Sequence, residues 1–234
     1  MGGLLDLVFP KQCLGCGEWG AYVCAECLNK LRPLRETICP ECGKLSGWGQ
    51  IHRGCVGAAR RGGLISVFAY AGVAKKTVTR FKYRLVRDLV ATMVELMISD
   101  GEWALIEKKQ MVVVGVPLHP RRLRWRGFNQ AELLGEASAE ALGWKYVSEV
   151  LERVRYTTPQ MELKGTQRRV NLVGAFAPGK AIKAVKDQPV LLVDDVWTTG
   201  ATMRECAKVL RLNGAKEVYG LTFARSVARC HESD

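Results

Sequence analysis

The sequence of 234 residues has no apolar run as long as the roughly 18–20 residues that a membrane-spanning helix needs. The apolar stretch from Leu4 to Phe9 is short, is interrupted by an acid and lacks a basic lead-in, which argues against a signal peptide. Asp6 stands where N-myristoylation requires Ser or Thr. We therefore expect a cytoplasmic protein that does not insert into a membrane.

Acidic residues are scarce, because 23 Asp and Glu stand against 35 Lys and Arg and give a formal net charge of +12. A charge this high favours polyanionic ligands, either phosphorylated metabolites or nucleic acid. An ordinary basic, solvated surface would have the same composition. The charge therefore suggests a ligand class without selecting one ligand.

Cysteines are abundant, and seven of the nine lie within the first 55 residues. Without a secretion signal, disulfides explain this poorly. Three Cys-x2-Cys pairs and one His-x2-Cys pair supply eight ligands, enough for two tetrahedral sites. Separate pairs and a mixed Cys3His set favour structural zinc over an iron–sulfur centre. The predicted ligands are Cys13, Cys16, Cys24, Cys27, Cys39, Cys42, His52 and Cys55.

Sequential pairing puts the first four ligands on one Zn²⁺ and the last four on another, although a cross-braced arrangement would use the same eight residues. Residues 10–59 have too little apolar periodicity to build a core without metal. We predict a double zinc ribbon at residues 1–59 and a larger domain at residues 60–234, with a linker at 58–63. Chelation is expected to unfold the ribbon and to leave the larger domain intact.

The larger domain alternates strand-like and helix-like segments, which predicts a parallel α/β sheet flanked by helices. Short, branched apolar runs mark the strands, and apolar residues at spacings of three and four or runs of helix formers mark the helices. Strands are expected at 64–70, 111–116, 190–193 and 217–223, and helices from 73 to 96 with a break near 83–86, at 129–142 and at 203–212.

The most informative segment is Val190–Thr202, a buried strand followed by two acids, a hydroxyl-rich turn and a helix. Backbone N–H groups at a helix start, together with threonine hydroxyls, bind a phosphate monoester. Gly200 lets the backbone approach that phosphate. Asp194 and Asp195 would repel a phosphate alone, but they suit sugar hydroxyls or a divalent cation. No Gly-x4-Gly-Lys-Ser/Thr motif is present, which excludes a Walker phosphate loop.

At these residues the chain resembles the type I phosphoribosyltransferases, whose signature binds 5-phosphoribosyl-1-pyrophosphate (PRPP). The resemblance spans roughly residues 64–225. It implies a type I phosphoribosyltransferase-like sheet and Mg²⁺ bound together with PRPP. It also implies that Asp194 and Asp195 hold the ribose hydroxyls and act at the catalytic centre, while the 5-phosphate lies on Thr198, Thr199, Gly200, Ala201 and Thr202.

A basic segment, residues 117–130, follows the strand predicted at 111–116. Arginine side chains bind pyrophosphate through planar, bidentate contacts. Because the stretch is long and polar, we expect a mobile flap that closes over the substrate. A solvated basic loop is the alternative. The flap residues expected to contact pyrophosphate are Arg121, Arg122, Arg124, Arg126, Gly127 and Asn129.

The cysteine pairs, Pro117 and the segment Arg124–Gln130 together resemble the ComF (competence protein F) family. The stretch from Arg153 to Phe176 fits this family as well, so that the resemblance covers nearly the whole chain. It implies a zinc module joined to a PRPP-binding fold and a link to DNA uptake in natural transformation. His52 departs from the pattern, because cysteine is common there, but histidine also binds zinc.

Two functions compete at this point. The first is an enzyme, a phosphoribosyltransferase that transfers ribose 5-phosphate from PRPP to an unidentified acceptor. The second is a non-catalytic protein that binds single-stranded DNA through phosphate contacts and stacking on Trp125 and Phe128, with PRPP as a regulatory ligand. We do not expect an amidotransferase, because the sequence shows no glutaminase domain with a cysteine directly after Met1. The acceptor, the oligomeric state and the partners in a DNA-uptake machinery stay open.

Overall fold

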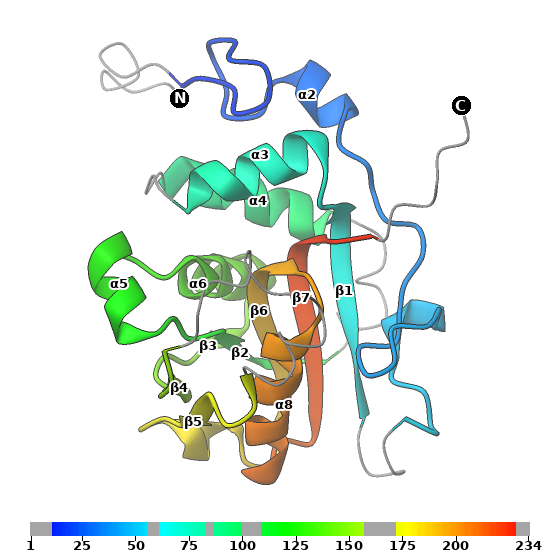
Figure 1. The fold of residues 1–234 in the computed structure, drawn as a ribbon, viewed down its shortest axis with the longest axis vertical. Coiled ribbons are helices and arrows are strands. Elements are labelled where there is room, and N and C mark those ends of the chain that lie inside the picture. The colour runs from blue at the N-terminus through cyan, green and yellow to red at the C-terminus, as the bar shows by residue number, and fades with distance from the viewer. Residues whose placement is uncertain (1–10, 56–60, 83–86, 100–108, 157–171, 228–234) are drawn as a thin grey trace.

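The computed structural model describes residues 11–55, 61–82, 87–99, 109–156 and 172–227. Its centre is a parallel five-stranded sheet with the strand order β1-β7-β6-β2-β3 (Figure 1). The strands are β1 (Arg61–Ala69), β2 (Val112–Gly115), β3 (Lys145–Tyr146), β6 (Pro189–Trp197) and β7 (Glu217–Arg225). A second, antiparallel pair is formed by β4 (Leu151–Arg153) and β5 (Phe176–Pro178).

Three helices cover one face of the sheet: α3 (Gly72–Phe81), α4 (Arg87–Ile98) and α6 (Gln130–Leu142). Their apolar side chains form one cluster with Val113, Leu191 and Phe223 of the sheet. The predicted break between α3 and α4, near residues 83–86, lies outside the described residues. The end of α6 is where the sequence predicts it, because Gly143 adopts a left-handed conformation there (φ +66°).

The opposite face is covered by α8 (Ala201–Leu212) and by the β4–β5 pair. Leu192 of β6 and Cys206 and Leu210 of α8 are buried together in a second apolar cluster. Alternate residues of the sheet therefore point into two different cores, as expected for parallel strands buried on both faces. The expected α/β sheet flanked by helices is confirmed.

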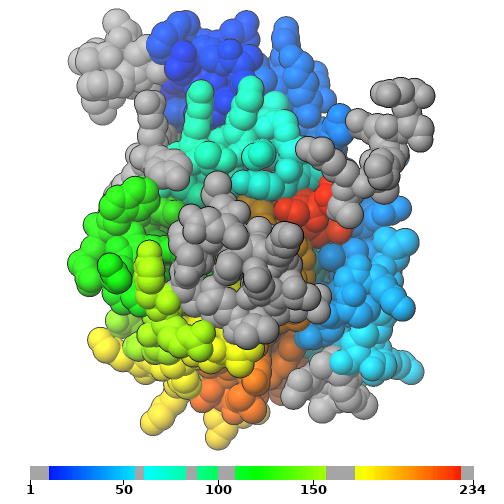
Figure 2. Space-filling model, viewed as in Figure 1, coloured from blue at the N-terminus to red at the C-terminus, as the bar shows by residue number. Residues whose placement is uncertain are grey.

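The N-terminal segment contains α2 (Ala25–Asn29), the 3-10 turn η1 (Gly47–Gly49) and little other regular structure. It packs against the sheet domain directly (Figure 2). Its first half shares the core of α3 and α4 through Leu14, Val23 and Leu31. Its second half runs along the β1 edge, where Leu34 N–H donates to the Val67 carbonyl over 2.8 Å.

Three details differ from the sequence-based expectation. Strand β6 does not end before the acids, because its pairing with β7 continues through Asp194 to Trp197. Residues 61–63 belong to β1 rather than to a linker. The basic segment is not a loop throughout, because it contains the helix α5 (Pro120–Arg126), with Pro120 at its first position and His119 as its N-cap.

The proposed domain boundary between residues 59 and 60 lies outside the described residues, as does the part of the family-like stretch from 157 to 171. The chain also contains η4 (Ile182–Val185), a single 3-10 turn before β6. Within the ranges described above, none of the helices combines the length and apolar character that crossing a bilayer requires.

Candidate functional site

The parallel sheet brings the ends of β6 and β2 to the same edge, because these two strands are neighbours. The turn at residues 198–200 follows β6, and the segment leading into α5 follows β2. Ligands of open α/β sheets bind outside the carboxyl ends of the strands. The acids, the threonine turn and the basic helix are thus positioned around one edge of the sheet.

The turn between β6 and α8 has the geometry that an anion site needs. Gly200 is the N-cap of α8 and has a left-handed backbone (φ +73°). A Cβ at this position would overlap the ring of Trp197, so both the conformation and the packing require glycine. The Thr199 hydroxyl is buried and finds no hydrogen-bond partner among the residues that the structure describes. A buried hydroxyl in this state is suited to a ligand.

The two acids have different surroundings. Asp195 is 8% exposed, and its Oδ2 lies 3.0 Å from Nζ of Lys82, at the end of α3. Asp194 Oδ1 accepts a hydrogen bond from the Asp195 N–H over 2.8 Å. Burial and the neighbouring Asp195 carboxylate raise the pKa of Asp194 to about 7. Burial opposes the charge of Lys82, but Asp195 and Asp194 prevail and raise its pKa.

Lys82 and Arg153 are site residues that the sequence-based list omits. Arg153 on β4 is 9% exposed, and its guanidinium lies 5.4 Å from the ring centre of Phe176. Burial and the nearby Arg122 lower the pKa of Arg153, whereas Asp194 acts in the opposite direction. The only sequence signal for Lys82 is its place at the end of an amphipathic helix. The signal for Arg153 is that it begins the stretch from Arg153 to Phe176 that resembles the ComF family. Both supply positive charge near the acids, Arg153 from a buried position and Lys82 from a half-buried one.

The four arginines of the basic segment lie on or at the end of α5, and they differ in their contacts. Arg121 and Arg122 lie over the ring of Tyr156, at 4.8 and 5.8 Å. Arg126 donates to Gln130 Oε1 over 2.6 Å. Arg124 is exposed. The helix ends at Gly127, which has a left-handed backbone (φ +82°).

Asn129 and Phe128 have structural contacts. The buried Asn129 accepts from the Ala131 N–H over 3.1 Å and donates to the Val116 carbonyl over 3.0 Å, which caps α6 and ties it to the end of β2. Phe128 packs against Phe81, with ring centres 6.2 Å apart. Phe128 is therefore partly buried, which leaves less of its ring for stacking than Trp125 offers, since Trp125 is 71% exposed.

The first metal-ligand group consists of Cys13, Cys16, Cys24 and Cys27, whose sulfur atoms all lie within 4.8 Å of one another. Cys16 Sγ and Cys24 Sγ are 3.6 Å apart, close to the roughly 3.8 Å that tetrahedral zinc with 2.3 Å bonds requires. Burial acts to raise the pKa of Cys13, but backbone N–H groups, including that of Cys24, lower it to about 6. The group suits a thiolate-bound metal.

The second group consists of Cys39, Cys42, His52 and Cys55, again with all ligand atoms within 4.8 Å of one another. The His52 Nδ1 atom lies 3.4 Å from Cys42 Sγ and 3.9 Å from Cys55 Sγ. Its Nε2 lies 3.0 Å from the Leu45 carbonyl, the distance of a hydrogen bond donated by Nε2–H. That bond leaves Nδ1 available for a metal. Histidine thus fits the position where cysteine is common.

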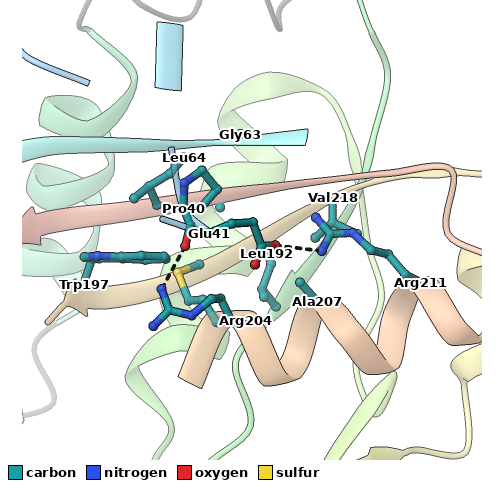
Figure 3. A pocket seen from close by; sticks show the side chains of 12 residues that line it. Pro40, Glu41, Gly63, Leu64, Leu192, Trp197, Arg204, Ala207, Arg211 and Val218 are labelled. Carbon is teal, nitrogen blue, oxygen red and sulfur yellow. Dashed lines mark hydrogen bonds and ion pairs between the residues drawn. The ribbon is translucent and has the colours of Figure 1, made fainter. Parts of the chain in front are cut away.

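The second metal-ligand group lies against α8, next to a small pocket between the ribbon and the sheet (Figure 3). Pro40 and Glu41 approach Arg204 and Arg211 of α8 there, and the ring of Trp197 lies along one side. Apolar side chains such as Leu64, Leu192 and Met203 line much of the rest. The lining of this pocket does not include Asp194, Asp195 or Lys82, so the pocket is separate from the two acids.

The raised pKa of Asp194 predicts how stability depends on pH. The folded-state pKa of about 7 exceeds the ordinary value of 3.8, so the folded state holds more protons between these values. The free energy of unfolding should therefore fall as the pH rises from about 4 to about 7. We expect Asp194→Asn to stabilise the fold at pH 8 by about 1–2 kcal/mol. Denaturant unfolding of wild type and variant at pH 5 and pH 8 measures this.

Asp187→Asn is the matched control for that prediction. Asp187 is exposed and has a positive φ of +59°, which asparagine also tolerates. Asp187→Asn removes one negative charge, as Asp194→Asn does, but removes it from an exposed carboxylate. If Asp194→Asn and Asp187→Asn changed stability equally at both pH values, burial of Asp194 would not be the cause.

Comparison with known proteins shows which families this chain resembles. Residues 4–56 match the family model described as "Double zinc ribbon domain". The chain is 31% identical over 225 residues to the DNA utilization protein YhgH of Salmonella typhi, covering 91% of this chain and 96% of that protein. It is 30% identical over 212 residues to competence protein ComFC of Bacillus subtilis, covering 87% and 84%. Competence protein F of Haemophilus influenzae is 32% identical over 152 residues, covering 64% and 66%.

Solved structures similar to the chain include an amidotransferase and a phosphoribosyltransferase. Glutamine PRPP amidotransferase from B. subtilis is 22% identical and has a TM-score of 0.36, covering 57% of this chain and 25% of that chain. A hypoxanthine phosphoribosyltransferase from Staphylococcus aureus is 14% identical, also with a TM-score of 0.36, covering 63% and 71%. The two metal-ligand groups, the parallel sheet and the 30–31% identity to ComFC and YhgH over most of the chain place this chain in the ComF (competence protein F) family.

Proposed function

We propose that the chain binds PRPP with Mg²⁺ at the carboxyl edge of its sheet and transfers ribose 5-phosphate to an acceptor that is still unidentified. The observation that supports this most is the β6–α8 turn, where a left-handed glycine, a buried hydroxyl and the start of a twelve-residue helix meet two acids. Phosphate at a helix N-terminus is stabilised by free N–H groups and by the helix dipole.

Each part of PRPP has a suitable counterpart at this edge. The 5-phosphate would accept hydrogen bonds from the N–H groups and hydroxyls of residues 198–202. The ribose hydroxyls would donate to the carboxylates of Asp194 and Asp195. These carboxylates also have the hard oxygen atoms that Mg²⁺ prefers, and a bound Mg²⁺ would add positive charge beside the pyrophosphate.

The leaving group needs positive charge, which the basic side chains around the site supply. Lys82 and Arg153 are held near the acids, and Arg121, Arg122, Arg124 and Arg126 come from α5. In the proposed step the bond between C1 of the ribose and the pyrophosphate oxygen breaks, and its electron pair leaves with pyrophosphate. The acceptor forms the new bond to C1, and these cations stabilise the departing charge.

A second candidate is the non-catalytic one, in which PRPP regulates binding of single-stranded DNA. Tyr156 favours it, because this residue is 47% exposed and its ring is flanked by Arg121 and Arg122. Such a ring can stack a base while arginines contact phosphates. The names "DNA utilization protein" and "competence protein" of the relatives support a link to DNA uptake in either case.

The remaining parts of the proposal concern organisation. We place two structural Zn²⁺ ions in the ribbon, one in each metal-ligand group, and keep residues 1–59 and 60–234 as the two units. Thiolate sites of this kind persist in a reducing compartment, which is in accord with a cytoplasmic protein.

Pyrophosphate release distinguishes the two functions. We expect the protein to release pyrophosphate from PRPP and Mg²⁺ when one class of acceptor is added, and the screen should include nucleobases, ammonia and DNA ends. The Asp187→Asn variant should match wild type, because Asp187 is exposed and lies before β6. Binding of PRPP without release for any acceptor would favour the regulatory role.

A further inference from the structure

Arg204 connects the second metal-ligand group to the proposed phosphate turn. Its Nη1 donates to the Pro40 carbonyl over 2.8 Å, and its Nη2 donates to the Thr199 carbonyl over 2.5 Å. Figure 3 shows its side chain beside Trp197, whose ring centre is 5.6 Å from the guanidinium carbon. One planar side chain therefore contacts two backbone segments that are 159 residues apart in sequence, counted from 40 to 199.

Each of the two carbonyls that Arg204 contacts belongs to a segment with a proposed ligand, a metal ion at Pro40 and a phosphate at Thr199. Pro40 lies between the ligands Cys39 and Cys42, so a metal held by these two sulfurs would hold the backbone that carries the Pro40 carbonyl. The Cys39 carbonyl also accepts from the Gly43 N–H over 2.9 Å, which closes residues 39–43 into a tight turn, here called the knuckle. Metal binding orders short segments of this kind, because its binding free energy is also folding free energy.

The other end determines the direction of an N–H group in the turn. A trans peptide is planar, so the Thr199 carbonyl and the Gly200 N–H point in opposite directions. By holding the carbonyl towards the ribbon, Arg204 turns the Gly200 N–H away from the ribbon. The left-handed conformation of Gly200 then starts α8 directly after it. The orientation of the first N–H groups of the site thus depends on Arg204.

We propose that Arg204 is a positioning residue through which metal binding at Cys39, Cys42, His52 and Cys55 keeps the turn at residues 198–200 in its phosphate-binding conformation. This inference rests on the proposed function in that the ligand of the turn is the 5-phosphate of PRPP. The coupling between metal binding and the turn at residues 198–200 does not require PRPP to be bound. Zinc in the second group thereby supports the site on the sheet as well as the ribbon.

Arg211 provides the matched control. It lies on the same helix and contacts the same knuckle, with its Nη1 3.3 Å from Glu41 Oε1. It lies two turns further along α8 than Arg204, away from the phosphate turn. Arg211→Met should therefore loosen the contact between ribbon and helix without releasing the Thr199 carbonyl, whereas Arg204→Met releases it.

The test compares Arg204→Met, Arg211→Met, His52→Ala and the double variant Arg204→Met/His52→Ala, with zinc content measured for each. Hydrogen exchange of the amides at residues 199–203 should become about tenfold faster in Arg204→Met, and PRPP affinity should fall about tenfold. Arg211→Met should change neither by more than about twofold. His52→Ala should have one zinc and the same faster exchange in this turn.

The double variant separates coupling from general damage. If Arg204 transmits the effect of the metal, adding His52→Ala to Arg204→Met should leave exchange in the turn no faster than in Arg204→Met alone. Additive effects, or unchanged exchange in Arg204→Met, would overturn the inference. Because exchange is measured without PRPP, a wild-type protein that fails to bind PRPP refutes the proposed function and leaves the coupling to be judged by exchange alone.

Discussion

Removal of both zinc ions is expected to unfold residues 11–55 and to destabilise the sheet domain with them. Structural zinc contributes about 10–16 kcal/mol of binding free energy at neutral pH, as much as or more than the whole stability of a typical domain. Leu14, Val23 and Leu31 of the ribbon belong to the same apolar cluster as α3 and α4. Loss of the ribbon would expose that face to water, so we expect a lower melting temperature for the helices and the sheet.

This expectation replaces the simpler one from the sequence, in which the larger domain survives chelation unchanged. Circular dichroism during titration with a strong chelator, with released zinc measured in parallel, follows both events. Addition of zinc in equal amount to the sites should restore the original melting temperature, which controls for direct effects of the chelator. Full release of zinc with an unchanged melting curve would contradict the shared core.

Asp195→Asn is expected to weaken PRPP binding about ten- to a hundredfold, because loss of a charge-assisted hydrogen bond costs about 1.5–3 kcal/mol. Asp194→Asn should weaken it to a similar degree at pH 8. At pH 6 its effect should be smaller, because with a pKa of about 7 much of wild-type Asp194 is already protonated there. Calorimetric titration of PRPP and Mg²⁺ at both pH values measures these differences.

The same variants distinguish a PRPP site from a nucleic-acid surface. Removal of a negative charge from a surface that binds DNA through phosphates should strengthen DNA binding slightly. Asp187→Asn is again the control, since it should leave PRPP affinity unchanged. Equal PRPP affinity of wild type, Asp194→Asn and Asp195→Asn would show that neither carboxylate contacts the ribose.

The sequence predicts the fold well where the signal is local. Branched apolar runs give four of the five sheet strands, and α6 ends at Gly143 as its pattern indicates. The spacing of the Cys-x2-Cys and His-x2-Cys pairs gives the eight metal ligands, whereas their sequential grouping, which the spacing leaves open, comes from the structure. These features depend on neighbouring residues, which is why they can be read from one sequence.

Other features depend on contacts between distant residues and are not visible in one sequence. Lys82 and Asp195 are 113 positions apart, counted from 82 to 195, and only the packing of α3 on the sheet joins them. The helix α5 forms in a stretch whose arginines read as a loop, because Pro120 and the His119 cap begin it. Arg204 looks like an ordinary helix residue until the ribbon is placed beside it.

The central claim, that this edge of the sheet binds PRPP, is tested most directly by calorimetric titration of the wild-type protein with PRPP and Mg²⁺ at pH 8. We predict saturable heat at one site per chain, accompanied by a rise in melting temperature with PRPP concentration. The absence of both heat and thermal stabilisation at millimolar PRPP, in protein that contains two zinc ions, would contradict the account.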